Sequence, residues 1–236
     1  MVGRGDVYRL DYGHFVRPAE ETGTGRARVE PALGYLVRHP RGLFVFDTGI
    51  GPADPETEAH YQLARRPFAA SLRSVGVGLD EVRWVVNCHL HFDHCGGNVH
   101  LPGRPIVVQA TELDAARQPG YTMPELVDFP GVRYETLTGE TELQSGVWVV
   151  PTPGHTAGHQ SLVVRCADGT VILAGQAHES ASQYAADQLA WRVAHHGEQA
   201  AAVLYPDWVD RLQRFDPARV VFAHDFAVWD LPVGSA

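Results

Sequence analysis

The chain has 236 residues, of which 44% are hydrophobic, and a formal charge of −9 at pH 7. This acidic balance argues against nucleic-acid and anionic-membrane partners, because both are bound by basic surfaces. The sequence has no run of 18 apolar residues, so we expect no transmembrane helix. Residues 1–6 lack the apolar stretch of a secretory signal. Three cysteines do not make a disulfide framework. We therefore expect a cytoplasmic protein, a monomer or homodimer, with no membrane or nucleic-acid partner.

Short apolar runs recur along the chain and predict strands. The first two, at 34–37 and 43–46, are joined by His39-Pro40-Arg41-Gly42 and predict a hairpin. Six further runs predict strands at 84–87, 106–109, 147–150, 160–165, 171–174 and 220–223. Helical patterns lie between some of these strands, at 111–117 and 207–215. No linker separates two domains, so we expect one layered α/β domain, residues 1–236, with two sheets inside.

The segment His89-Leu90-His91-Phe92-Asp93-His94 follows an apolar run and holds three imidazoles and one carboxylate. His89, His91 and Asp93 are two residues apart, so an extended backbone would point all three to one side. We expect the His94 side chain on the opposite side of the group that these three residues bind. Imidazole and carboxylate groups are ligands for Zn, Fe or Mn. A polar loop whose histidines only hydrogen-bond is the plainer alternative, but this density of ligand-type residues favours a metal site.

Other candidate ligands come directly after predicted strands. They are His155, after the strand at 147–150, Gln176, after 171–174, and His224, after 220–223. A side chain at the end of a strand can reach a shared cleft while its backbone stays in the scaffold. The chain has thirteen histidines, so spacing alone leaves open whether His155 and His224 are ligands or ordinary polar residues.

Five blocks of sequence stand in a fixed order. They are Phe46-Asp47-Thr48-Gly49, His89-Leu90-His91-Phe92-Asp93-His94-Cys95-Gly96-Gly97-Asn98, Val107-Val108-Gln109, Thr152-Pro153-Gly154-His155-Thr156-Ala157-Gly158-His159-Gln160-Ser161-Leu162 and Phe222-Ala223-His224-Asp225. Together they resemble the metallo-β-lactamase superfamily and, more narrowly, its quorum-quenching N-acyl-homoserine lactonases. The resemblance implies an α/β (α+β) fold, a four-layer αββα sandwich with a two-metal site at the edge of the inner sheets.

The resemblance also implies a role for each candidate residue. The first metal ion would be held by three imidazoles, those of His89, His91 and His155. The second would be held by one carboxylate and two imidazoles, those of Asp93, His94 and His224. Asp47 would orient a ligand histidine from behind, and His159 would be structural. The ions would be zinc, one or two of them, with Fe or Mn as alternatives.

Two positions depart from the family pattern. Gln176 stands where the family has an aspartate that bridges both metals, and we still count it among the metal ligands. An amide oxygen can coordinate but carries no charge, so the second ion should bind less tightly. Glu179 stands where the lactonases have a tyrosine that assists the substrate carbonyl. Glu179 could return the missing carboxylate as a catalytic residue, or it could be a solvated loop charge.

The activity that the resemblance implies is the opening of a lactone ring, above all of an N-acyl-homoserine lactone. A metal-activated hydroxide would attack the carbonyl, and the catalytic Asp93 would pass a proton to the leaving alkoxide. The partner would thus be a small-molecule lactone or ester. Two alternatives stay open: a hydrolase of the same fold acting on another ester, a thioester or a β-lactam in secondary metabolism, and a catalytically weakened binding protein.

Five apolar side chains lie in segments that cap the acyl pocket in the family. They are Phe15, Tyr61, Phe68, Tyr121 and Met123. Packing in the hydrophobic core explains any one of them equally well.

Overall fold

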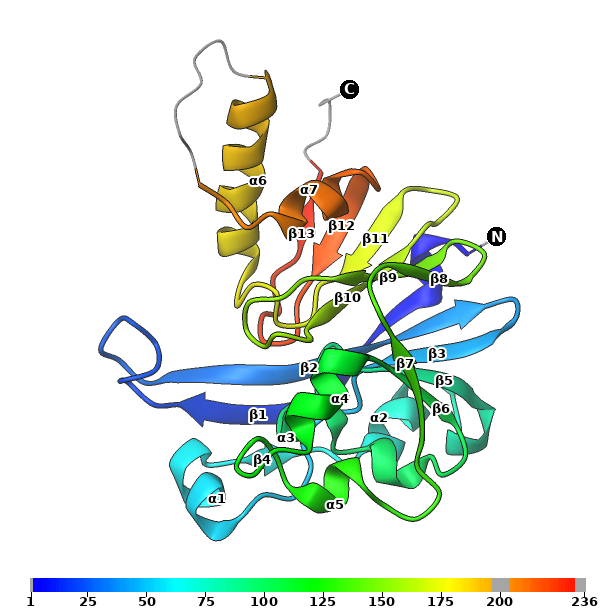
Figure 1. The fold of residues 1–236 in the computed structure, drawn as a ribbon, viewed down its shortest axis with the longest axis vertical. Helices are drawn as coiled ribbons and strands as arrows, with labels where there is room; N and C mark the ends of the chain where they lie inside the picture. The colour runs from blue at the N-terminus through cyan, green and yellow to red at the C-terminus, as the bar shows by residue number, and fades with distance from the viewer. Residues whose placement is uncertain (1, 197–203, 232–236) are drawn as a thin grey trace.

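The computed structural model describes residues 2–196 and 204–231, and these form two β-sheets packed face to face between outer helices (Figure 1). The first sheet has the strand order β4-β1-β2-β3-β5-β6-β7, and the second has the order β13-β12-β11-β10-β9-β8. Strands of the first sheet come from the N-terminal part of the chain, and those of the second sheet from the C-terminal part.

The first sheet begins as an antiparallel meander and continues with parallel strands. Its members are β1 (Val7–Arg17), β2 (Arg28–His39), β3 (Gly42–Phe46), β4 (Ala64–Arg65), β5 (Val82–Val86), β6 (Pro105–Gln109) and β7 (Arg133–Leu137). The predicted hairpin is confirmed, because β2 and β3 pair with Val37 opposite Phe44. The parallel strands β5 and β6 are covered on both faces, which explains their near-continuous apolar sequences.

The second sheet is antiparallel except for the parallel pair of β11 and β12. Its strands are β8 (Thr141–Gln144), β9 (Val147–Pro151), β10 (Gln160–Val164), β11 (Thr170–Leu173), β12 (Pro217–Val221) and β13 (Trp229–Asp230). Every predicted strand overlaps an observed one. The strand predicted at 220–223 begins three residues earlier, at Pro217, and ends at Val221.

Helices cover the outer face of each sheet (Figure 1). The helices on the side of the first sheet are α1 (Pro55–Tyr61), α2 (Phe68–Ser74), α3 (Phe92–Cys95), α4 (Ala110–Ala116) and α5 (Pro124–Val127), with 3-10 turns at η2 (Leu79–Glu81) and η3 (Asn98–His100). A further 3-10 turn, η1 (Arg4–Asp6), lies beside the loop between β10 and β11, where the Arg4 N–H donates to Asp168 at 2.8 Å. The second sheet has α6 (Ala181–His196) and α7 (Trp208–Gln213). The two predicted helices correspond to α4 and α7. None of the described helices is long and apolar enough to cross a membrane.

Three apolar layers hold the sandwich together. Side chains such as Phe44 and Leu162 fill the space between the two sheets. Leu113 of α4 packs on the outside of the first sheet, and Leu212 of α7 packs with Ile172 on the outside of the second. Each such buried side chain contributes about 1.5–3 kcal/mol relative to exposure. The predicted four-layer αββα sandwich is therefore confirmed.

Candidate metal centre

The candidate residues meet at one edge of the sandwich, because the strands that precede them end there. Asp47 follows β3 and His89 follows β5 in the first sheet. In the second sheet, His155 follows β9, Gln176 follows β11 and His224 follows β12. The parallel pairs β3–β5 and β11–β12 place their carboxyl ends together, so loops distant in sequence converge on one site.

The expectation of an extended segment through Asp93 is wrong. The backbone is extended at His91 and then turns into the short helix α3, which starts at Phe92. The carbonyl oxygen of His91 accepts hydrogen bonds from the N–H groups of His94 and Cys95, at 3.0 and 3.2 Å. This turn brings Asp93 and His94 back toward the same cluster as His89 and His91, which a continuing strand could not do.

Three ring nitrogens form what we call the imidazole corner, from His89, His91 and His155. His91 Nδ1 lies 3.0 Å from His89 Nε2 and 3.2 Å from His155 Nε2. Ring nitrogens this close repel each other through their lone pairs unless a proton or a cation lies between them. Tetrahedral zinc with Zn–N bonds of 2.0–2.1 Å separates its nitrogens by about 3.3 Å, so the corner fits a divalent cation.

The carboxylate corner consists of Asp93, His94, His224 and Gln176. His94 Nε2 lies 3.2 Å from His224 Nε2, and Asp93 Oδ2 lies 3.5 Å from both nitrogens. His224 Nδ1 donates to the carbonyl oxygen of Pro31 at 2.9 Å, which leaves Nε2 as an acceptor. Gln176 Oε1, also an acceptor, lies 3.3 Å from that Nε2. Two acceptors facing each other again fit a cation between them.

Asp47 supports the carboxylate corner from behind. Its Oδ2 accepts a hydrogen bond from His94 Nδ1 at 3.0 Å, and its Oδ1 accepts one from the Cys88 backbone N–H at 2.8 Å. Asp47 is buried and has a positive φ of 61°. Aspartate tolerates this left-handed conformation better than most residues do. The geometry agrees with the predicted orienting role of Asp47.

Burial and charge set different protonation states in the two corners. Burial, followed by the neighbouring imidazoles, lowers the pKa of His89 well below its usual value, so its ring is neutral. Burial alone would lower the pKa of His94 too, but Asp93 and Asp47 outweigh it and raise this pKa to about 9. Burial would raise the pKa of Asp93, yet His94 and His224 hold it at about 2. His89 and Asp93 are thus in the forms that bind metals, a neutral imidazole and an ionised carboxylate, whereas His94 must lose a proton to bind one.

A buried carboxylate that the sequence analysis missed joins the loops of the imidazole corner. Glu112 of α4 accepts hydrogen bonds from the Leu90 N–H and from Thr156 Oγ1, both at 2.7 Å. The Tyr121 hydroxyl donates to the same carboxylate, and its ring packs on His91 with centroids 4.6 Å apart. The available signal was a glutamate on the apolar face of a predicted helix, beside Leu113.

The structure places the remaining predicted residues as follows. His159 is fully buried; its Nδ1 donates to the Thr152 carbonyl oxygen and its Nε2 accepts from the Gln176 N–H, both at 3.1 Å. With both ring nitrogens bonded to backbone, His159 has the expected structural geometry. Glu179 forms an ion pair with Arg28 at 3.0 Å. It is not among the residues that line the cavity over the cluster, so its catalytic role stays a prediction without geometric support.

A cavity of about 420 Å³ opens over the cluster. His91, Asp93, His155 and Gln176 line its floor, and four of the five predicted capping residues line its walls: Phe15, Tyr61, Tyr121 and Met123. Arg17 and Glu21 also line it, and Arg17 Nε donates to the buried Glu30 at 2.8 Å. The cavity can therefore hold a partly apolar molecule against the cluster.

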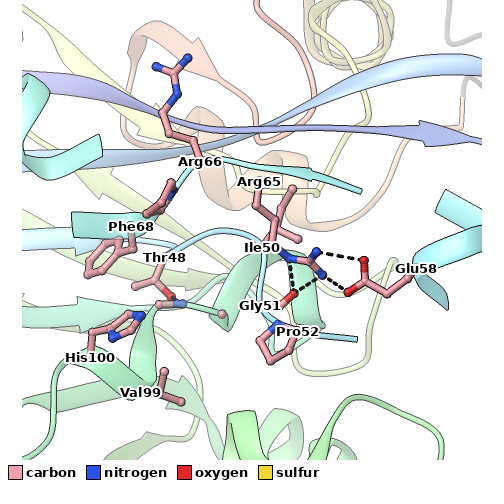
Figure 2. A pocket seen from close by; sticks show the side chains of 13 residues that line it. Thr48, Ile50, Gly51, Pro52, Glu58, Arg65, Arg66, Phe68, Val99 and His100 are labelled. Carbon is pink, nitrogen blue, oxygen red and sulfur yellow. Dashed lines mark hydrogen bonds and ion pairs between the residues drawn. The ribbon is translucent and has the colours of Figure 1, made fainter. Parts of the chain in front are cut away.

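Phe68 lies elsewhere, which corrects its expected place in the acyl pocket. It lines a second cavity, of about 480 Å³, together with residues such as Thr48 and His100 (Figure 2). There Arg65 Nε and Nη2 donate to the Gly51 carbonyl oxygen at 2.9 and 2.7 Å, and Arg65 also pairs with Glu58. None of the cluster residues lines this second cavity. The other arginine of this cavity, Arg66, forms an ion pair with Asp11 at 3.4 Å. Both arginines are thus already paired, so we assign the cavity no ligand.

Gly51 and Gly96, which both line the second cavity, meet backbone to backbone. A Cβ atom added to Gly96 would lie 2.0 Å from the Gly51 nitrogen. The Gly51 N–H donates to the carbonyl oxygen of Phe92 at 2.7 Å, and the Gly96 N–H donates to Gly49 at 2.8 Å. Glycine at position 96 thus lets the loop after β3 touch the helix that carries Asp93 and His94.

The comparison with protein families agrees with this arrangement. A family model described as the metallo-beta-lactamase superfamily matches residues 27–224. This chain belongs to the metallo-β-lactamase superfamily.

Within the superfamily, the chain is similar to several lactonases. An N-acyl homoserine lactonase of Bacillus thuringiensis is 40% identical over 156 residues, which cover 61% of this chain and 62% of that relative. The N-acyl homoserine lactonase AttM of Azorhizobium caulinodans is 26% identical over 240 residues, covering 88% of this chain and 86% of AttM. The match to the B. thuringiensis protein thus spans less than two thirds of its length.

Solved structures share the fold. An N-acyl homoserine lactone hydrolase with the product N-hexanoyl-L-homoserine at its catalytic metal centre superposes with a TM-score of 0.73 and 24% identity, covering 96% of this chain and 94% of that one. AidC, a dizinc quorum-quenching lactonase, superposes with a TM-score of 0.66 and 16% identity, covering 100% and 93%. At these identities, the likeness establishes the fold of the metallo-β-lactamase superfamily for the whole described chain.

Proposed function

We propose that this protein is a metal-dependent hydrolase that opens lactone rings, with N-acyl homoserine lactones as its substrate class. The observation that carries the proposal is the convergence of three imidazoles beneath an open cavity. His91 Nδ1 lies within 3.2 Å of both His89 Nε2 and His155 Nε2. The lactonase names of the sequence relatives support the choice of substrate. The ionised Asp93 on the cavity floor gives the site an acceptor for the proton of water.

We propose zinc as the metal, held at one or both corners. The imidazole corner would provide the first set of ligands, and Asp93, His94 and His224, with the Gln176 amide oxygen, would provide the second. When bound, a divalent cation supplies a Lewis acid that polarises a carbonyl and lowers the pKa of water. At the carboxylate corner, where His94 and His224 are buried, the low local dielectric strengthens this effect.

The side chains of the cavity have separate tasks in this proposal. Asp93 accepts a hydrogen bond from the attacking water and so orients it toward the carbonyl carbon. As the ring carbon–oxygen bond breaks, the proton from water passes to the ring oxygen, and the product is a hydroxy acid. Phe15, Tyr61 and Met123 contact the acyl arm, while Tyr121 packs on His91 and limits its motion.

The decisive test is ring opening by the zinc-loaded protein. Homoserine lactones of several acyl lengths are assayed by pH drift and mass, before and after chelation. We expect turnover that chelation abolishes and zinc restores. A matched control is His39→Ala. His39 is a half-buried histidine at the end of β2, far from the cluster in the fold, and its Nε2 lies 3.2 Å from the Ser145 carbonyl oxygen. This variant should retain full activity.

Gln176 gives a specific reason to keep a second candidate, a binding protein with weakened catalysis. It places a neutral amide, not a carboxylate, 3.3 Å from His224. Binding of lactones without turnover, by protein shown to be loaded with zinc, would favour this candidate. Hydrolysis of thioesters or β-lactams in place of lactones would keep the hydrolase and change its substrate class.

A further inference from the structure

Cys88 is a fully buried thiol that contacts both corners of the metal centre from behind. Its Sγ lies 3.1 Å from His89 Nδ1, 3.3 Å from His94 Nδ1 and 3.0 Å from Asp47 Oδ2. His89 belongs to the imidazole corner and His94 to the carboxylate corner. The thiol is therefore placed where the outer sides of the two corners meet.

The hydrogens in this group can be assigned from the available acceptors. The Cys88 S–H donates to Asp47 Oδ2, and His94 Nδ1–H donates to the same oxygen. The sulfur atom, having given its hydrogen to Asp47, is left as an acceptor for His89 Nδ1–H.

We infer that Cys88 is a positioning residue shared by both corners. By accepting from His89 Nδ1–H, it fixes the tautomer in which His89 Nε2 is free to face His91. By donating to Asp47, it joins His89 to the carboxylate that orients His94. Outer contacts of this kind set the direction and basicity of ligand imidazoles. The inference rests on the proposed metal site and concerns a residue that does not itself bind the ion.

The backbone of Gly175 packs closely against the Cys88 side chain. At this glycine, which has a φ of +58°, an added Cβ would lie 2.5 Å from Cys88 Cβ and 2.8 Å from its Sγ. Cys95 makes the contrast. It is equally buried, but its Sγ donates to the Leu90 carbonyl oxygen, at 3.5 Å, and it packs in the apolar layer outside the first sheet. The two buried thiols, seven residues apart, thus differ in their hydrogen bonds: Cys88 contacts ligand histidines, whereas Cys95 bonds to a backbone carbonyl oxygen.

The test compares Cys88→Ala, Cys88→Ser and the matched control Cys95→Ala, using full-length protein. Zinc affinity is measured by competition with a chromophoric chelator, and unfolding of the metal-free proteins is measured by heating. Imidazole N–H signals are followed by NMR of nitrogen-15-labelled protein. None of these readouts depends on hydrolysis.

We expect Cys88→Ala to weaken zinc binding by about 10–100-fold and to lose the protected His89 N–H signal. Cys88→Ser should recover affinity to within a few-fold of the unmodified protein, because a hydroxyl also accepts from His89 and donates to Asp47. Cys95→Ala should lose thermal stability like Cys88→Ala but keep its zinc affinity.

Two results would overturn the inference: Cys88→Ala binding zinc as tightly as the unmodified protein, or Cys88→Ser binding as weakly as Cys88→Ala. A third result distinguishes failure of the proposed function from failure of the role of Cys88. If the unmodified protein binds no zinc, the proposed function fails first and the role of Cys88 fails with it.

Discussion

In the imidazole corner three ring nitrogens meet, and none of the described carboxylates forms an ion pair with them. In the carboxylate corner Asp93 lies among the nitrogens, and Asp47 supports them from behind. The first corner holds its loops through Glu112, a carboxylate outside the cluster that bonds the backbone and hydroxyl groups of those loops. The carboxylate corner is held instead by ion pairs that Asp93 and Asp47 form with its imidazoles.

This difference has a consequence for how each corner can bind a cation. Neutral rings such as His89 need no proton removed, so the imidazole corner is ready at neutral pH. The carboxylate corner draws its affinity from negative charge, and Gln176 supplies none. We therefore expect unequal affinities, with the imidazole corner filled first. The following changes test that comparison, from the largest expected effect to the smallest.

Removing His91 should abolish function. His91 Nδ1 is the nitrogen that contacts both His89 and His155. Loss of an outer contact alone costs 10–100-fold in metal affinity, so His91→Ala should lower affinity and lactone turnover by more than about 100-fold. Metal content after dialysis and ring-opening rates are the measurements. A variant that still holds stoichiometric zinc would contradict the assignment of the imidazole corner.

Glu30→Gln should destabilise the strand behind the carboxylate corner. Glu30 is buried, and its Oε1 accepts from Arg17 and Arg28 at 2.8 and 2.7 Å. The next residue, Pro31, holds His224. Loss of these charged hydrogen bonds should cost roughly 1.5–3 kcal/mol at pH 7, as measured by urea unfolding.

The same variant should show a pH dependence of known sign. Burial alone would raise the pKa of Glu30, but its bonds to Arg17 and Arg28 lower it below its usual 4.5. The folded state then binds fewer protons than the unfolded state, so this stabilisation is complete above about pH 4.5. It is lost as the pH falls through the folded pKa. A gap between variant and unmodified protein that stays constant down to pH 2 would contradict this account.

Gln176→Asp should strengthen the weaker corner. The new carboxylate would stand at the carboxylate corner, near His224. Its attraction for the second cation is worth several kcal/mol even at a moderate effective dielectric. Part of this is offset by its desolvation, so we expect roughly a tenfold gain in affinity for the second ion. Stepwise zinc titration measures it. Two equally tight ions in the unmodified protein, with no gain in the variant, would remove the distinction between the corners.

Tyr121→Phe should have the smallest effect. It removes the hydroxyl that donates to Glu112 but leaves the ring packed on His91. Glu112 keeps its bonds to Leu90 and Thr156, so the loss of stability should be about 1 kcal/mol. Thermal unfolding and zinc competition are the readouts. Loss of zinc without loss of stability would show that the hydroxyl acts on the metal directly.

The strands most easily predicted from the sequence are those with continuous apolar side chains, such as β5 and β6, because they are buried on both faces. β1 was missed, since charged and polar residues such as Arg9 and Asp11 interrupt its apolar positions. The long helix α6 was also missed; its exposed Leu189 blurs the apolar stripe. The turn at Phe92 was predicted as strand, because alternation of His89, His91 and Asp93 imitates a β pattern.

The ligand-type residues could be predicted because a metal site needs imidazoles and carboxylates, which are conspicuous in a sequence. Their supports could not. Glu112 and Cys88 act through contacts with residues far away in the chain or behind the cluster, and nothing in their local sequence reveals those contacts. Arg28, which pairs with Glu179, is likewise brought there only by the fold.

The contact between Gly51 and Gly96 limits which amino-acid substitutions this protein can tolerate. A library that randomises position 96 would place side chains into the backbone of the loop after β3, 2.0 Å from the Gly51 nitrogen. Even alanine would push apart the two segments that hold Asp47 and His94, so such clones should lose zinc with every ligand intact. Directed evolution should therefore retain both glycines and vary the cavity walls, at positions such as Phe15 and Met123.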